Sequence, residues 1–464
     1  MRVTLTGRKI IIILLILVVI FPIARRFAAR KIDEKDLERM YFHQRMSPHK
    51  VPVIFIPGMM ASILENEDTG DVVYGNVFQG HIAELELPID KPTVRENRDN
   101  VIATRVLGGF TWIEGILEAG IHRMLQRVIL KTGGYVLNEN AFLCPWDWRR
   151  DFIEATKVLH EKIELIKRRS NQPDIKINLL CHSAGGLVAR YYAKYGTEDV
   201  LDQNPLPLPN YAGATNINRI IMLGTPNTGS MEMFEVLYEG VWIPGVGSAE
   251  PEIVFTMPGL YQLLPENTED IFIDHQGHPL AVDIYDPAQW EKYGWSVFCP
   301  YYKEKERNAL IEEYGKRKGK RLYKENLGKQ RQHLTTVLGR AKRFHEALWN
   351  GDPAEEKKKV RYVVLGGNAE PTLRRVVLEK KGSGWRTRFN SRSTVVKKLL
   401  YGYGDESVTK ESLIGRRRVP TGGGELQIRH IPAEYEVFIF SKHVDMTKNM
   451  TYLDNVLHAL LDED

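Results

Sequence analysis

The sequence predicts an α/β protein whose mainly parallel sheet is covered by helices on both faces. Short apolar segments typical of buried strands alternate with longer segments whose apolar residues recur at helical spacing. The 464 residues are enough to bury a large core, and 43% hydrophobic and 27% charged residues are typical of a globular protein. A net charge of +5 is small for this length, so we expect no nucleic-acid partner.

The N-terminal segment has the composition of a membrane anchor. An apolar run from Ile10 to Ile23 lies between basic groups, and Ala24 and the stems of the flanking basic side chains extend it toward the roughly 17–25 residues of a spanning helix. A cleaved signal peptide is the alternative, but Arg25 and Arg26 stand where cleavage requires small residues. We predict an uncleaved anchor in residues 1–30 and a linker or helix over 31–50. Basic residues on both flanks leave the orientation open, with the extracytoplasmic side favoured.

Six apolar segments are predicted to be strands of one sheet, at 51–56, 141–144, 175–180, 217–223, 360–365 and 437–440. Helical periodicity begins near Trp112 and at Gly185, and also marks 159–166, 334–348 and 450–461. The prolines and charges of 79–109 predict loops. Between 231 and about 330 the alternation of elements breaks down, which predicts a cap inserted in a catalytic domain of residues 51–464.

A serine stands where the strand at 175–180 turns into a helix. Ser183 has small neighbours two positions away on either side, Cys181 and Gly185. A strained turn that exposes a nucleophilic serine requires such neighbours, although glycine is usual where Cys181 stands. An ordinary strand-to-helix turn with a surface serine is the alternative interpretation.

Two further residues complete a nucleophilic constellation. Asp405 follows Gly404 in a glycine-rich turn, and His443 follows the last predicted strand. The chain order Ser, Asp, His is the one that an α/β-hydrolase sheet imposes. In this chemistry, histidine takes the proton of the serine, while the carboxylate fixes the tautomer of the imidazole. The alternatives are Glu406 as the acid and His430 as the base.

The other histidines are predicted to be structural. His182 adjoins the serine but is expected to point away from the site, and helical patterns contain His333, His345 and His458. For the tetrahedral oxyanion, the backbone N–H of Ala184 is one donor by position. Met60, in the loop after the first strand, is the preferred second donor, with Met59 as the alternative.

Cysteine usage indicates neither a disulfide framework nor a metal site. The three cysteines are Cys144, Cys181 and Cys299, and the sequence contains no CxxC motif or His/Cys cluster. We therefore expect no metal and no cofactor.

Five motifs together resemble those of the lecithin:cholesterol acyltransferase-like family, which includes phospholipid:diacylglycerol acyltransferases and lysosomal phospholipases. They are FIPGMMAS at 55–62, PWDWR at 145–149, LCHSAGG at 180–186, LGTP at 223–226 and GDESV at 404–408. The resemblance implies an α/β-hydrolase fold, a Ser183–Asp405–His443 triad, a lipid acyl donor and a cap over the site. Cys181, the Glu406-Ser407 pair and the missing lid cysteines depart from the family pattern.

These observations predict a membrane-anchored lipid O-acyltransferase that works through an acyl-serine and takes membrane lipids as substrates. A phospholipase or lipase that passes the same acyl group to water is the close alternative. A catalytically silent, membrane-tethered binding module is the third hypothesis. Protein partners are not predicted.

Overall fold

Six parallel strands form the central sheet of the computed structural model, in the order β18-β11-β7-β6-β1-β5. They are β1 (Val53–Ile56), β5 (Ala141–Leu143), β6 (Ile177–His182), β7 (Ile217–Leu223), β11 (Tyr362–Gly367) and β18 (Ala433–Ile439). Each strand overlaps one predicted strand, so the mainly parallel sheet is confirmed. The structure describes residues 33–75, 82–107, 124–243, 247–266, 271–420, 426–443 and 445–462.

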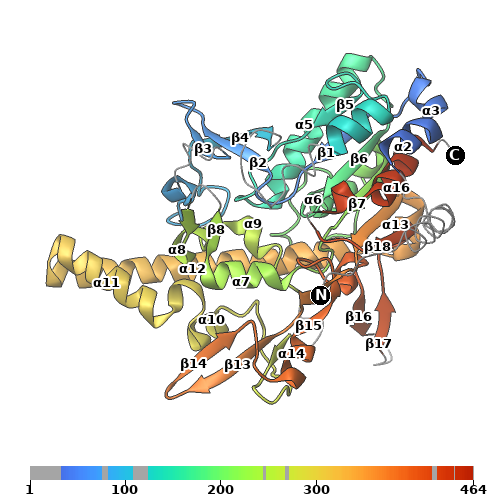
Figure 1. Ribbon diagram of the computed structural model, residues 1–464. Coiled ribbons are helices and arrows are strands. Elements are labelled where there is room, and N and C mark those ends of the chain that lie inside the picture. The colour runs from blue at the N-terminus through green and yellow to red at the C-terminus, as the bar shows by residue number, and fades with distance from the viewer. Residues whose placement is uncertain are drawn as a thin grey trace, which may run out of the picture.

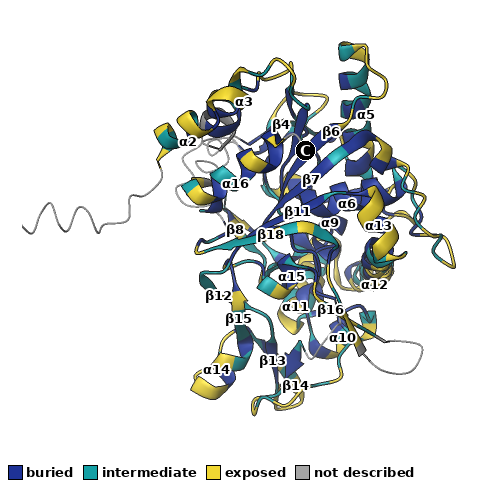
Figure 2. Ribbon diagram, turned by 90° about the vertical axis from the view of Figure 1, so that its right-hand side faces the viewer, coloured by how far each residue is buried: buried dark blue, intermediate teal, exposed yellow. Residues whose placement is uncertain are grey.

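Both faces of this sheet are buried, which explains why its strands read as nearly continuous apolar runs. Ile54, Leu179 and neighbouring residues of the same pleat face a core shared with α5 (Phe152–Ser170), α6 (Gly185–Tyr195) and α12 (Lys316–Trp349). The alternate residues, such as Phe55 and Leu180, face a second core that contains α16 (Met450–Leu461). Figure 2 shows β6, β7 and β11 in the colour of buried residues. The predicted helices at 159–166, 334–348 and 450–461 lie within these elements.

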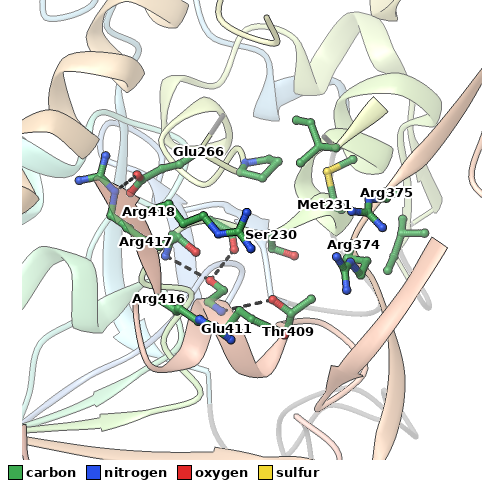
Figure 3. A pocket seen from close by; sticks show the side chains of 16 residues that line it. Ser230, Met231, Glu266, Arg374, Arg375, Thr409, Glu411, Arg416, Arg417 and Arg418 are labelled. Carbon is green, nitrogen blue, oxygen red and sulfur yellow. Dashed lines mark hydrogen bonds and ion pairs between the residues drawn. The ribbon is translucent and has the colours of Figure 1, made fainter. Parts of the chain in front are cut away.

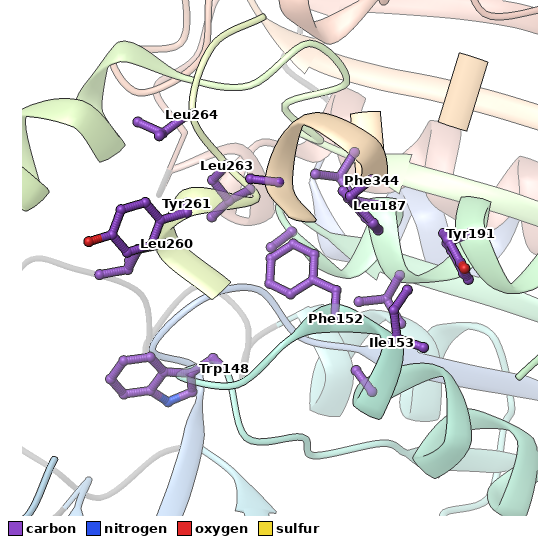
Figure 4. Close-up of a cluster of buried hydrophobic side chains, with 14 of the residues drawn as sticks. Trp148, Phe152, Ile153, Leu187, Tyr191, Leu260, Tyr261, Leu263, Leu264 and Phe344 are labelled. Carbon is purple, nitrogen blue, oxygen red and sulfur yellow. The ribbon is translucent and has the colours of Figure 1, made fainter. Parts of the chain in front are cut away.

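Aromatic contacts join the covering helices on the first face. Phe152 of α5 lies edge-on to Phe344 of α12, with ring centroids 5.6 Å apart, and Tyr191 of α6 stacks on Phe344 at 5.7 Å. Residues 260–264, which begin in α9 (Pro258–Tyr261), add apolar side chains to the same cluster (Figure 4). The helices α5, α6 and α12 and residues 260–264 therefore pack together in the core on this face of the sheet.

A long excursion separates β7 from β11 (Figure 1). It contains α7 (Met231–Glu239), β8 (Val241–Ile243), β9 (Gly247–Ala249), α8 (Pro251–Val254), α9, β10 (Phe272–Ile273), α10 (Pro287–Tyr293), η4 (Ser296–Phe298), α11 (Pro300–Tyr314) and α12. β10 pairs with β13 (Val376–Lys381), which in turn pairs with β14 (Gly384–Arg388). Chain segments from before and after β11 therefore meet in one layer, around Phe234 and Trp295, whose rings lie 4.8 Å apart.

The remaining elements are short. The helices and helical turns are α3 (Phe42–Met46), η1 (Ile82–Leu85), η3 (Gly213–Asn216), α13 (Pro353–Lys359), α14 (Thr394–Leu400), α15 (Lys410–Leu413) and η5 (Met446–Lys448). Two antiparallel pairs are β12 (Glu370–Leu373) with β15 (Tyr401–Gly404), and β16 (Arg417–Pro420) with β17 (Leu426–Arg429). The β12–β15 pair and α15 border the turn that contains Asp405.

The prediction of loops throughout 79–109 was wrong. β4 (Val101–Val106) pairs with β2 (Ser62–Asn66) in an antiparallel sheet that also contains β3 (Val72–Tyr74). Of β4, Val101 and Val106 at its two ends are buried, while the residues between them are exposed or half-buried. A strand that buries so few residues shows no clear alternation of apolar and polar residues in its sequence. The charged residues before it made the segment look still more like a loop.

The N-terminal region packs against the end of the chain. In α2 (Glu34–Met40) Leu37 is buried, and the Tyr41 hydroxyl donates to the Asp454 carboxylate of α16 at 2.8 Å. The anchor predicted within residues 1–30 lies outside the described residues, and no described helix could span a membrane. The helix predicted to begin near Trp112 also lies partly outside them; its described end is helical, as η2 (Met124–Thr132).

Candidate active site

Ser183 lies in a strained turn between β6 and α6. Its φ is 50°, in the left-handed region that side chains rarely adopt. The Ser183 N–H donates to the Leu223 carbonyl of β7 at 2.8 Å, which fixes the turn at the end of the sheet. A Cβ on Gly185 would lie 2.8 Å from the Pro57 carbonyl oxygen, so only glycine lets α6 approach β1 this closely. Cys181 is buried in register with Ile56 and Met222, where a small side chain packs without strain.

Asp405 and His443 meet directly. The Nδ1 atom of His443 lies 2.8 Å from the Asp405 carboxylate, and the His443 N–H donates to the Asp405 carbonyl at 2.7 Å. The other carboxylate oxygen accepts the Ser407 and Val408 N–H groups. Burial disfavours the imidazolium, but the Asp405 charge and hydrogen bond outweigh burial and raise the pKa of His443 above its usual value. Both side chains are buried, so water does not screen this pair.

The two alternatives weighed for these roles lie elsewhere. Glu406 is exposed, and its carboxylate pairs with the Lys442 ammonium at 3.2 Å instead of with an imidazole. His430 lies between β17 and β18, at the opposite end of β18 from His443. Of the two candidate acids, Asp405 is therefore the one that contacts a histidine.

Close backbone approach brings the serine turn and the histidine to one edge of the sheet. A Cβ on Gly224, which directly follows β7, would lie 2.9 Å from Cε1 of His443. Ser183 is bound to Leu223, the residue before that glycine. A Cβ on Gly58 would lie 2.7 Å from the Cβ of Ser183. Three strand ends thus bring His443, Ser183 and the Gly58 loop together, as expected where parallel strands end.

His182 does not point away from the site, contrary to the prediction. Its ring is buried, with its centroid 5.1 Å from that of His443. Burial, and then the nearby charge of His443, lower the pKa of His182 to about 3, so this ring is neutral. Successive side chains of a strand point to opposite faces of the sheet. The side chain of His182, the last residue of β6, therefore points to the face on which His443 lies.

The predicted oxyanion donors lie in the loop after β1, which contains Met60, and at the start of α6, which Ala184 caps. Met60 has a φ of 57°, its carbonyl accepts the Tyr74 hydroxyl at 2.9 Å, and Ala184 is buried at the start of α6. Neither the Met60 nor the Ala184 N–H donates to any other residue in the described ranges, and the same holds for Met59. These amides therefore have hydrogen-bonding capacity for a ligand.

The PWDWR motif at 145–149 supports this loop. The Trp146 indole N–H donates to the Pro57 carbonyl at 2.9 Å, and the Trp146 backbone N–H donates to Ser62. Arg149 is fully buried and pairs with Asp99 and Asp147 at 2.7 and 2.8 Å. The motif thus braces the segment between β1 and β2 from within the core.

Glu232 is a site residue that the sequence did not reveal. It lies in the first turn of α7, its carboxylate bonds to Ser407, and its charge helps to raise the pKa of His443. Burial raises the pKa of Glu232. An acidic residue in a first helical turn is an ordinary capping signal, so only the packing of α7 on the Asp405 turn distinguishes it. Within the described residues, no group of three or more His, Cys, Asp or Glu side chains could hold a metal ion.

Comparison with known proteins identifies the family and the fold of this chain. The family model described as lecithin:cholesterol acyltransferase matches residues 75–415. No curated protein sequence matches the chain. A chain of the crystal structure of the Tle4–Tli4 complex is similar in structure, with a TM-score of 0.52 and 13% identity over 89% of this chain and 98% of that chain.

Two further solved structures are more distant. Phospholipase PlaB from Legionella pneumophila has a TM-score of 0.35 and 12% identity over 89% of this chain and 60% of its own. The propeptide form of the Bacillus licheniformis lipase BlEst2 has a TM-score of 0.34 and 12% identity over 90% and 52%. The predicted α/β-hydrolase fold is confirmed. The family model matches well over half of the residues of this chain, so the chain belongs to the lecithin:cholesterol acyltransferase family.

Proposed function

We propose that the protein is a serine-dependent lipid O-acyltransferase in which Ser183, His443 and Asp405 act as a catalytic triad. The observation that carries this proposal is the buried 2.8 Å contact between His443 and Asp405, at the sheet edge where Ser183 turns. Family membership supports an enzyme that transfers or hydrolyses a lipid acyl ester.

In this mechanism, His443 donates a hydrogen bond from its Nδ1–H to the Asp405 carboxylate. Its Nε2 is then unprotonated and accepts the Ser183 proton. The Ser183 oxygen attacks the ester carbonyl of the donor lipid, and the oxyanion that forms accepts hydrogen bonds from the backbone N–H groups of Met60 and Ala184. The tetrahedral intermediate expels the lipid alcohol, which receives the proton from His443 and leaves an acyl-serine.

The second half-reaction reverses these steps with a new hydroxyl group. His443 deprotonates an alcohol acceptor, which attacks the acyl-serine and carries away the acyl group as a new ester. Hydrolysis would use the same acyl-serine with water in place of the alcohol. Transfer therefore requires that the layer of α7 to α11 above the sheet exclude water and admit an acceptor.

We also propose that residues 1–30 anchor this catalytic domain to a membrane, with segment 231–330 as its cap. The apolar run 10–23 with its basic flanks supports the anchor. Such an anchor would hold the domain next to its lipid substrates.

The test is incubation of the purified full chain with labelled phospholipid, with and without an alcohol acceptor. A labelled new ester that forms only with the acceptor supports transfer, whereas free fatty acid alone in both reactions supports a phospholipase. Ser183→Ala should abolish either product and labelling by a fluorophosphonate probe, while Ser170→Ala, on α5, serves as the matched control. Equal labelling of native protein and Ser183→Ala would leave a catalytically silent binding module.

A further inference from the structure

The loop between β1 and β2 is held by its carbonyl oxygens. Three of them accept hydrogen bonds of 2.9 Å from neighbouring segments. The donors are the Trp146 indole N–H to Pro57, the Tyr74 hydroxyl to Met60 and the Leu107 N–H to Ala61. In contrast, the N–H groups of Gly58, Met59 and Met60 donate to no residue in the described ranges. The loop therefore has fixed carbonyls and available amides, which is what a site for an anionic oxygen requires.

Met60 has the unusual backbone conformation of this loop. Its φ is 57°, in the left-handed region that a residue with a side chain disfavours. Met59 and Met60 form a turn, and in a tight turn the sign of φ at the second central residue decides which way the central peptide group faces. A return of Met60 to negative φ would turn this peptide group over. The Met59 carbonyl would then replace the Met60 N–H, and a carbonyl oxygen repels an oxyanion.

Tyr74 lies where it can oppose that change. Its hydroxyl donates to the carbonyl of Met60 itself, so the peptide group that follows Met60 is held in place. Tyr74 is buried at the end of β3, and its ring lies edge-on to the Trp148 ring of the PWDWR motif, with centroids 5.1 Å apart. β3 pairs with β2, which begins directly after the loop (Figure 1). The small antiparallel sheet thus brings a rigid hydroxyl donor to one peptide group of the loop.

A comparable bond holds the turn that contains Asp405. The Ser230 hydroxyl, in the wall of an arginine-lined cavity (Figure 3), donates to the Ser407 carbonyl at 2.6 Å. That bond acts on the turn of the candidate acid, whereas the Tyr74 bond acts on the loop with the available amides. Loss of the Tyr74 hydroxyl should therefore lower the rate without changing the ionisation of His443.

We infer that Tyr74 is a positioning residue for the oxyanion site, whose hydroxyl keeps Met60 in the left-handed conformation and keeps the Met60 N–H available to the oxyanion. The inference rests on the proposed function, because it requires an oxyanion at Ser183. Removal of one oxyanion donor lowers kcat by about 10²–10³-fold. Loss of the bond that holds the donor misplaces it in only part of the molecules, so we expect a smaller effect, of roughly 10-fold.

The first measurement is the hydrolysis of a soluble nitrophenyl ester by Tyr74→Phe, which removes the hydroxyl and keeps the ring on Trp148. We expect kcat to fall roughly 10-fold while KM stays within about twofold, because the oxyanion forms only in the transition state. The acid limb of the pH profile should not move, since the contact between His443 and Asp405 is unchanged.

The matched control is Tyr285→Phe, in the segment between β7 and β11. It removes a buried hydroxyl that also donates to a backbone carbonyl, that of Leu264 at 3.0 Å. This control should keep kcat within about twofold, because the lost bond does not act on the loop. A fall of less than about threefold in Tyr74→Phe, or an equal fall in both variants, would overturn the inference.

The second measurement tests whether Tyr74 acts through the conformation of Met60. Glycine adopts positive φ without strain, so a protein with Met60→Gly should depend less on the hydroxyl. Adding Tyr74→Phe to Met60→Gly should lower kcat by less than about threefold, against roughly 10-fold when Met60 is present. An equal fall in the two backgrounds would show that Tyr74 does not act through Met60, and the inference would be wrong.

Failure of the proposed function would give a different result. If the native protein shows no turnover that Ser183→Ala abolishes, the proposed function fails whatever the effect of Tyr74→Phe. Crystal structures of the native protein and of Tyr74→Phe then decide whether the hydroxyl holds Met60. A negative φ at Met60 in Tyr74→Phe alone would support this hold, whereas a φ that stays near 57° in both would overturn it.

Discussion

Replacing Gly58 by alanine should damage the candidate site while leaving every proposed catalytic residue unsubstituted. The added Cβ would lie 2.7 Å from the Cβ of Ser183 and 3.2 Å from Nδ1 of His182. Non-bonded carbon atoms prefer about 3.5–4.0 Å, so the loop that holds Met60 has to move by roughly 1 Å. A displacement of about 1 Å costs on the order of 100-fold in rate, or about 2.7 kcal/mol of activation free energy. Gly58 is not among the residues with positive φ, so the predicted effect is steric.

The assay is hydrolysis of a soluble nitrophenyl ester, together with the rate of fluorophosphonate labelling and urea unfolding of each variant. The matched control is Gly339→Ala in α12, where an added Cβ meets nothing within 4 Å. This control should keep full activity and gain up to about 1 kcal/mol in unfolding free energy from helix propensity. If Gly58→Ala retains kcat/KM within about threefold of the native protein, the assignment of this loop to the oxyanion site is refuted.

Three further predictions concern the histidine and the core beneath it. Asp405 raises the pKa of His443, and the base must be neutral, so the acid limb of the kcat/KM profile should lie at higher pH than for an ordinary histidine. Asp405→Asn should move this acid limb to lower pH and reduce kcat by roughly 10⁴-fold. Glu232→Gln should move the same limb in the same direction but by less, with the plateau rate within about tenfold; an unmoved limb would exclude Glu232 as an electrostatic partner. Arg149→Met leaves the Asp99 carboxylate short of a buried partner and should lower the urea-unfolding free energy by roughly 3 kcal/mol, whereas a loss below about 1 kcal/mol would show that the remaining donors compensate.

The local pattern of the sequence was sufficient for the central sheet and for the chain order of the site. All six strands of the sheet were found as apolar runs, because a parallel strand buried on both faces leaves a strong local signal. The turns at Ser183 and Asp405 were found because strained or tight turns restrict residue type locally. The choice of Asp405 over Glu406 followed from position alone, and the structure brings Asp405 to His443.

Contacts between distant segments were decided only by the tertiary structure. The strand β4 buries too few residues to be read from its own sequence, and the direction of His182 depends on which face of β6 receives His443. Glu232 is an ordinary charged residue in the sequence, and its contact with Ser407 exists only because α7 packs on the turn that contains Asp405. The physical reason is that hydropathy records how deeply a residue is buried, whereas the partner it meets there is set by how the elements pack.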